Sequence, residues 1–180
     1  MTDALAMWRE VAAGFDQRLA MVGADEWTAP TCCEGWTVTQ LVGHAIGSQR
    51  FIPKALGARG DIDREGDDLV EVWNAVRAAA DEALGAPGAL DEVVTLPFGE
   101  MPAGEGLGFP IGDLLVHTWD LARAIGADDR LDAEACAVTY ANLQPIDGSL
   151  RTPGFFGPKL EPAPDADAQD TLLAFVGRQV

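Results

Sequence analysis

The stretch that decides the fold reads Ile111-Gly112-Asp113-Leu114-Leu115-Val116-His117-Thr118-Trp119-Asp120-Leu121-Ala122-Arg123-Ala124. Most of its side chains are apolar, as expected of a helix that packs into a protein core. Pro110 is favoured in the first turn of a helix, and Gly126 is favoured just after a helix ends. The sequence therefore predicts a helix that begins near Pro110 and ends before Gly126.

Three polar residues lie on one strip of this otherwise apolar helix. Asp113 and His117 are four residues apart, so their side chains stack on the same face. Asp120 follows Asp113 by seven residues and falls on the same strip. An unpaired carboxylate in a helical core would be costly, and a metal ion would offset that cost by taking up the charge. The pair Asp113 and His117 is therefore a candidate for two ligands of one ion.

Other segments carry the periodicity and the capping signals of helices. The predicted helices before and after this one cover about residues 5–22, 37–52, 68–84, 133–143 and 166–176. Thr37 and Gln40 fit a capping box at the start of the second helix, and Pro53 should end or kink it. Residues 93–96 form a short predicted strand that pairs across Gly99 with Met101. Predicted loops cover residues 57–66, 104–108 and 148–164.

Four main helices, two shorter ones and almost no strand predict an all-α fold. The expected architecture is a four-helix bundle with additional short helices and at most a small β-hairpin. A chain of 180 residues is of the size of one domain, so a single bundle domain over residues 1–180 is expected. Bundles build metal sites from side chains on facing helices, which points to a partner helix for Asp113 and His117.

Charge and cysteine content exclude several classes of function. The chain has 29 acidic and 12 basic residues and a net charge of -17, which repels phosphate backbones and anionic lipids. Neither nucleic acid nor a membrane is therefore an expected partner. No apolar run is long enough to span a membrane, and charged residues interrupt the first apolar stretch. The three cysteines are not a disulfide framework, which predicts a cytoplasmic protein with reduced thiols.

His44 completes the candidate metal site. The chain has two histidines, and His44 lies in the second predicted helix beside its apolar residues. With Asp113 and His117 it makes a set of two histidines and one carboxylate, which suits zinc, nickel or ferrous iron. Two alternatives remain open at this point. Each histidine could be a hydrogen-bonded structural residue of the core, and Asp113 and His117 could form a simple salt bridge.

A second cluster precedes the second helix. Cys32 and Cys33 stand just before a helix N-terminus, where thiols could bind metal or take part in redox chemistry. The alternative is that both are small residues packed in a loop. Trp36, directly before the predicted cap at Thr37, fits a hydrophobic staple.

These motifs resemble a known family. The stretch Cys33-Glu34-Gly35-Trp36-Thr37-Val38, the following Leu41-Val42-Gly43-His44 and the run from Val116 to Arg123 are similar to DinB-like proteins of actinobacterial type. That family includes the mycothiol-dependent maleylpyruvate isomerases. The resemblance implies a DinB-like four-helix bundle with a divalent metal ion, often zinc, in a three-ligand site. The implied ligands are His44, Asp113 and His117, with Asp113 in place of a longer glutamate.

The resemblance also shapes the functional expectation. We expect a metal-dependent enzyme of thiol-transferase or thiol-assisted isomerase type, with a small-molecule substrate or a low-molecular-weight thiol such as mycothiol. Asp120 is the expected catalytic residue, either as a base or by orienting His117. The isomerases carry an additional C-terminal domain for which this chain has no room, so their particular substrate is not transferred. A homodimer is also compatible with a bundle of this kind.

Two alternatives to an enzyme stay open. One is a non-catalytic bundle, such as a stress-response or binding module, that uses the metal for stability. A fourth protein ligand such as Cys33 would favour this structural role, whereas an open coordination position would favour catalysis. The other alternative is a bundle whose metal site has been lost.

Overall fold

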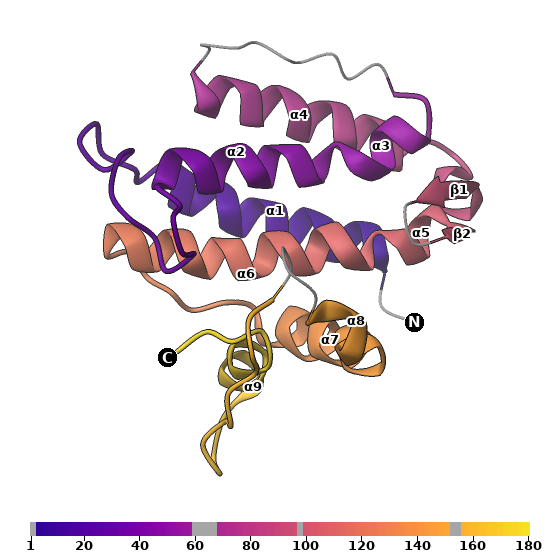
Figure 1. Cartoon of the computed structure of the whole chain (residues 1–180). Coiled ribbons are helices and arrows are strands. Elements are labelled where there is room, and N and C mark those ends of the chain that lie inside the picture. The colour runs from indigo at the N-terminus through magenta and orange to yellow at the C-terminus, as the bar shows by residue number, and fades with distance from the viewer. Residues whose placement is uncertain (1–2, 59–67, 97–98, 152–155) are drawn as a thin grey trace. The chain divides into compact units, whose positions relative to one another are not determined.

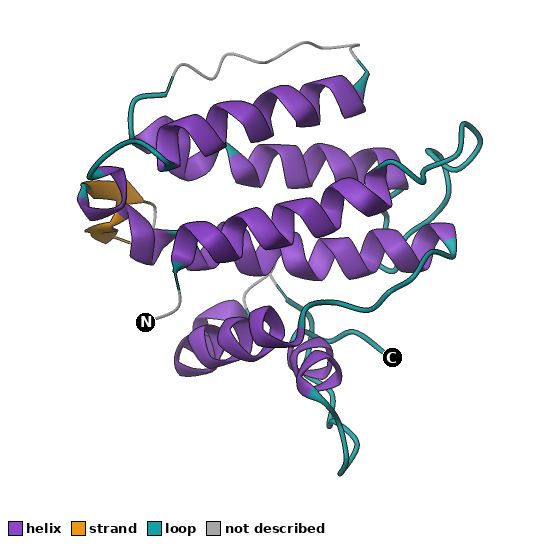
Figure 2. Ribbon diagram, turned by 180° about the vertical axis from the view of Figure 1, so that it is seen from behind, coloured by secondary structure: helices purple, strands orange, loops and turns teal. Residues whose placement is uncertain are grey.

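The structure is a computed structural model, and it describes residues 3–58, 68–96, 99–151 and 156–180. The chain divides into two compact units, residues 1–128 and 129–180, and each is described by itself. The single domain over residues 1–180 stays a prediction. Within the described ranges, no helix is both long enough and apolar enough to cross a membrane. Figure 2 shows how strongly helices dominate the chain, which confirms the predicted all-α class.

The first unit is built on four long helices. They are α1 (Ala4–Leu19), α2 (Val38–Gln49), α4 (Leu69–Leu84) and α6 (Gly108–Ile125). Helix α6 packs against α1 and α2, while α4 packs against α2 and α1, so the four helices enclose one core (Figure 1). The largest fully buried side chains of this core include Trp8, Phe15, Leu41, Trp73, Leu114 and Trp119.

The helix ends follow the local signals in the sequence. The backbone N–H of Thr37 donates to Gln40 Oε1 at 2.7 Å, as a capping box requires. Helix α2 ends at Gln49, and the short helix α3 (Phe51–Ala55) follows after Arg50. Pro53 has no N–H with which to bond the carbonyl of Gln49, four residues earlier, which explains the interruption. The predicted break at Pro53 is therefore confirmed, although it falls a few residues before the proline.

Gln49 connects three of the long helices inside the core. Its side chain is 2% exposed. Trp8 Nε1 on α1 donates to Gln49 Oε1 at 2.9 Å, and Gln49 Nε2 donates to the carbonyl of Pro110 on α6 at 3.0 Å. Because each of these groups is removed from water, the bonds fix α1, α2 and α6 relative to one another.

A small hairpin joins α4 to α6. Strands β1 (Val93–Leu96) and β2 (Gly99–Pro102) are antiparallel, with Val94 opposite Met101, as predicted. The 3₁₀ turn η1 (Ala89–Asp91) precedes them. The expected loop over residues 104–108 is wrong, because α5 (Ala103–Gly106) and the start of α6 occupy it. A Cβ at Gly106 would lie 2.9 Å from Leu96 Cδ1, so this glycine allows close packing rather than flexibility.

The second unit contains α7 (Ala133–Leu143), the 3₁₀ turn η2 (Gln144–Ile146), α8 (Asp147–Leu150) and α9 (Ala168–Phe175). Asp132 caps α7, with Oδ1 accepting the Ala135 N–H at 2.8 Å. Helix α7 packs against α9. The predicted loop over residues 148–164 is partly wrong because α8 extends to Leu150. Residues 152–155, and most of the predicted loop at 57–66, lie outside the described residues.

Candidate metal centre

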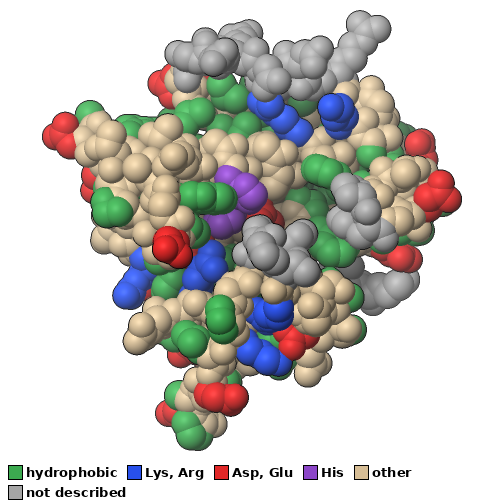
Figure 3. Space-filling model, viewed as in Figure 1, with side chains coloured by type: hydrophobic (Ala, Val, Ile, Leu, Met, Phe, Trp, Pro, Cys, Tyr) green, Lys and Arg blue, Asp and Glu red, His purple; other side chains and the backbone are tan. Residues whose placement is uncertain are grey.

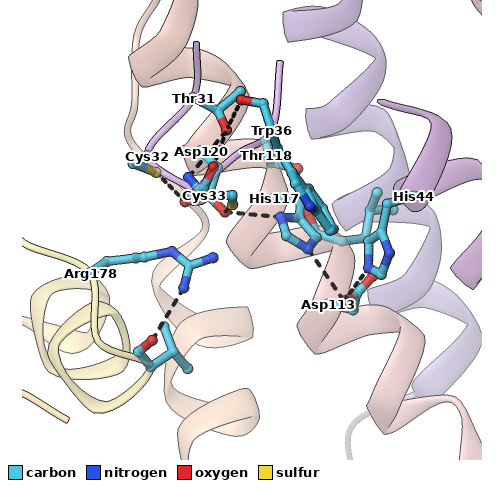
Figure 4. Close-up of polar contacts among 12 residues, drawn as sticks. Thr31, Cys32, Cys33, Trp36, His44, Asp113, His117, Thr118, Asp120 and Arg178 are labelled. Carbon is cyan, nitrogen blue, oxygen red and sulfur yellow. Dashed lines mark hydrogen bonds and ion pairs between the residues drawn. The ribbon is translucent and has the colours of Figure 1, made fainter. Parts of the chain in front are cut away.

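The packing of α2 against α6 brings the three predicted ligand residues together. His44 lies on α2, and Asp113 and His117 lie on α6. Asp113 Oδ1 is 3.2 Å from His44 Nε2 and 3.5 Å from His117 Nε2. One ligand atom from each residue lies within 4.8 Å of the other two. Figure 4 shows both imidazoles turned toward Asp113, and all three residues belong to the first unit.

The second carboxylate oxygen of Asp113 marks the site as one that fits a cation. Asp113 Oδ2 is buried and has no hydrogen-bond partner among the described residues. A buried carboxylate oxygen without a partner is costly, and a cation is the group that would compensate it. Two imidazole nitrogens and a carboxylate are also a common ligand set for zinc and related divalent metals. The residues present therefore fit a divalent metal ion.

The site lies at the surface of the bundle rather than deep within it. His44 was expected on the core side of its helix, but its side chain is 41% exposed. The side chain of Asp113 is 28% exposed, whereas that of His117 is 9% exposed. Histidine side chains are visible on the face of the molecule shown in Figure 3. Solvent and small molecules can therefore reach the side of the site formed by His44.

Without metal, the site is a network of ion pairs. Burial raises the pKa of Asp113, but hydrogen bonds with His117 and then His44 outweigh it and hold that pKa well below its usual range. Burial lowers the pKa of His117, but hydrogen bonds with Asp113 and Asp120 outweigh it and hold that pKa well above its ordinary value. The imidazolium of His117 thus supplies positive charge in the metal-free protein. A metal ion would have to displace that proton in order to bind.

Asp120 lies on the opposite edge of the His117 ring. Asp120 Oδ2 is 2.9 Å from His117 Nδ1, whereas Asp113 approaches Nε2. The Asp120 side chain is fully buried. A carboxylate that accepts from one ring nitrogen orients the other nitrogen toward a metal and raises its basicity. This geometry matches the orienting role considered for Asp120.

The two adjacent thiols also contact Asp120. Cys32 Sγ donates to Asp120 Oδ1 at 2.9 Å, and Cys33 Sγ donates to Oδ2 at 3.2 Å. The hydrogen bond with Cys33, burial and the charge of Asp120 raise the pKa of the Cys32 thiol well above its usual range. Cys33 is not among the three residues that converge around Asp113. The structure therefore does not offer Cys33 as a fourth ligand at that centre.

Trp36 belongs to the site, although its place in the sequence indicated only a hydrophobic staple. Its ring centroid is 4.9 Å from that of His44 and 5.7 Å from that of His117, where the rings stack. The backbone N–H of Trp36 donates to the carbonyl of Cys33 at 3.0 Å, and Gly35 in this turn has a φ of 78°. In the sequence, Trp36 stands directly before the capping box of the helix that carries His44, and this position could have indicated that its side chain lies near His44.

Comparison with known proteins adds two findings. The family model described as the mycothiol maleylpyruvate isomerase N-terminal domain matches residues 8–122, which include His44, Asp113 and His117. Two proteins of Mycobacterium tuberculosis, Uncharacterized protein Rv0738 of strain H37Rv and Uncharacterized protein MT0763 of strain CDC 1551, are each 32% identical to the chain over 180 residues. Each alignment covers 99% of both chains. No solved structure matches the chain.

Proposed function

We propose a function from one established premise: the chain belongs to the family of the mycothiol maleylpyruvate isomerase N-terminal domain, a DinB-like, metal-binding family. In this proposal His44, Asp113 and His117 hold one divalent metal ion, for which zinc is the first choice. The protein then acts as a metal-dependent thiol transferase or thiol-assisted isomerase. Its cosubstrate is a low-molecular-weight thiol of the mycothiol type, and its substrate is a small organic molecule.

The observation that carries the proposal is the convergence on Asp113. One of its oxygens lies within 3.5 Å of Nε2 of both histidines, and the other is buried without a partner among the described residues. An ordinary salt bridge would leave that second oxygen uncompensated, whereas a dication would neutralise the whole carboxylate. The short arm of aspartate is compatible with this arrangement because α2 and α6 are in direct contact.

The residues around the ligands support a reactive rather than a closed centre. Asp120 holds His117 through Nδ1 and so keeps Nε2 available. Trp36 lies against both imidazole rings and restricts their rotation. The exposure of His44 leaves an approach for a thiol, and Cys33 is bonded to Asp120 instead. A bound dication would lower the pKa of a thiol in its open coordination position and so supply a thiolate at neutral pH.

Metal analysis of the purified protein tests the first half of the proposal. We expect at least about one equivalent of a divalent metal in protein purified without added metal. His44→Ala should lose about one equivalent of metal relative to the unmodified protein, while Lys54→Ala, which removes an exposed side chain of α3, should keep all of it. Full metal occupancy in the His44→Ala protein would refute the ligand assignment.

Calorimetric titration with mycothiol tests the second half. Metal-loaded protein should bind mycothiol, and metal-free protein or mycothiol methylated on sulfur should bind much more weakly. Equal binding of the thiol and its methylated form would show that the sulfur does not coordinate the metal. In that case the non-catalytic alternative, a bundle that uses its metal for stability, would replace the proposed enzyme.

A further inference from the structure

We propose that Cys32, Cys33 and Asp120 form a second cation site, separate from the centre at His44, Asp113 and His117. The ion that this site would bind is a thiophilic metal ion such as Zn²⁺ or Cd²⁺. One donor atom from each of the three residues lies within 4.8 Å of the other two, and none of these residues belongs to the first group. This site does not depend on the proposed thiol chemistry, because it has its own ligands.

The convergence of two adjacent cysteines on one carboxylate is the main observation. Neighbouring side chains in an extended segment point to opposite sides, so both thiols reach Asp120 only because the loop is folded. Thr31 holds that loop: its backbone N–H donates to the carbonyl of Trp36 at 2.9 Å, and its Oγ1 accepts the Cys33 N–H at 3.1 Å. The isolated bridge between Pro30 and Thr37 closes the base of the loop. The donors are therefore preorganised.

The types of donor determine the class of ion. Cysteine thiolates are soft ligands that select zinc-like and other thiophilic ions over Mg²⁺ and Ca²⁺, which prefer oxygen. As each metal–sulfur bond forms, the thiol loses its proton to solvent. Asp120 Oδ1, which accepts from Cys32 in the metal-free protein, becomes the third ligand atom, while Oδ2 stays bonded to His117 Nδ1.

The position of the three residues allows an ion to enter. Cys32 is exposed and Cys33 is partly exposed, so an ion can arrive from solvent on the thiol side. Asp120 is fully buried and anchors the site on α6. With three protein ligands, such a site leaves one tetrahedral position for water. Figure 4 shows the thiols and Asp120 on one side of the His117 ring and Asp113 on the other.

Cadmium titration tests the second site in a protein that lacks the first. In the double variant His44→Ala and Asp113→Asn, reduced with a phosphine that carries no thiol, Cd²⁺ should bind with about one equivalent. Binding should produce the ultraviolet charge-transfer absorption of a cadmium thiolate. Adding Cys32→Ser or Cys33→Ser should remove that absorption, whereas adding Cys136→Ser, in the second unit, should leave it unchanged. Circular dichroism of each variant verifies that it is folded.

Two outcomes would overturn the proposal. One is the absence of thiolate absorption in the folded double variant, which would mean that the thiols only donate hydrogen bonds to Asp120. The other is absorption that survives Cys32→Ser and Cys33→Ser but disappears with Cys136→Ser. Because the double variant has no first site, neither outcome bears on the proposed thiol chemistry. Should Cys33→Ser fail to fold, the Cys32→Ser variant alone decides, since Cys32 is exposed.

Discussion

Replacing Asp120 by asparagine should weaken metal binding at the centre formed by His44, Asp113 and His117, although Asp120 is not one of its three ligands. The change keeps the size of the side chain and removes its charge. Asp120 Oδ2 lies 2.9 Å from His117 Nδ1, and the side chain is fully buried, so water cannot readily replace the lost interaction. Changing a group that supports a metal ligand in this way typically lowers metal affinity about 10- to 100-fold. That corresponds to about 1.4–2.7 kcal/mol of binding free energy.

The assay is a competition for zinc between the protein and a chromophoric chelator of known affinity, at fixed pH and ionic strength. Every protein compared carries Cys32→Ser and Cys33→Ser, so that only the centre at His44, Asp113 and His117 is measured. Glu82→Gln is the matched control, because it makes the same change of charge at an exposed position on α4. We expect the control to bind zinc as tightly as the unmodified protein. Asp120→Asn should still bind about one equivalent of zinc, but with an affinity that is about 10- to 100-fold lower.

The result that would refute this reasoning is unchanged zinc affinity in folded Asp120→Asn. It would mean that the hydrogen bond to His117 Nδ1 neither orients the ring nor raises its basicity. A complete loss of folding in both metal-free and zinc-bound protein would instead assign Asp120 a role in core stability. Thermal unfolding of the metal-free variant separates the two cases.

Four further predictions concern the metal, the protonation of His117 and the core of the bundle. Chelation of the metal should lower the melting temperature by about 5–10 °C, compared with protein in free metal at about 100 times Kd. Bound metal at that concentration adds about 2.7 kcal/mol to the free energy of unfolding, and each kcal/mol shifts the melting temperature of a chain of this size by about 2–4 °C. An unchanged melting curve would contradict this prediction. Metal affinity should fall as pH decreases through the raised pKa of His117, starting above its ordinary value of 6.5, because the metal needs the neutral imidazole. The stability of the metal-free protein should instead decrease as pH rises. The stability supplied by the His117 imidazolium is complete below pH 6.5 and is lost as pH rises through the raised pKa of His117. Urea unfolding across this pH range would detect the loss. Gln49→Leu should destabilise the bundle by about 1–3 kcal/mol, because it leaves the buried Trp8 Nε1 without its acceptor, and urea unfolding that matches the unmodified protein would refute this.

The helices themselves could be predicted from the sequence because their signals are local. The capping pair Thr37 and Gln40, the cap at Asp132 and the missing N–H of Pro53 each act within one turn of backbone. The stacking of Asp113 and His117 is local for the same reason, since residues four apart share a face of any α-helix. Loops were less predictable: the glycines of residues 104–108 indicated flexibility, but Gly106 permits close packing against Leu96.

Only the tertiary structure decided which groups meet across helices and what each one contacts. His44 joins Asp113 because α2 packs on α6 with a particular register, and its exposure depends on that packing rather than on its own helix. Asp120 shares the strip of Asp113, yet it bonds to the other nitrogen of His117, a choice set by side-chain rotamers and burial. Trp36 and the two thiols reach the site through the folded loop before α2. The sequence thus determined the helices and the types of polar side chain, whereas non-local packing determined which of these side chains lie together.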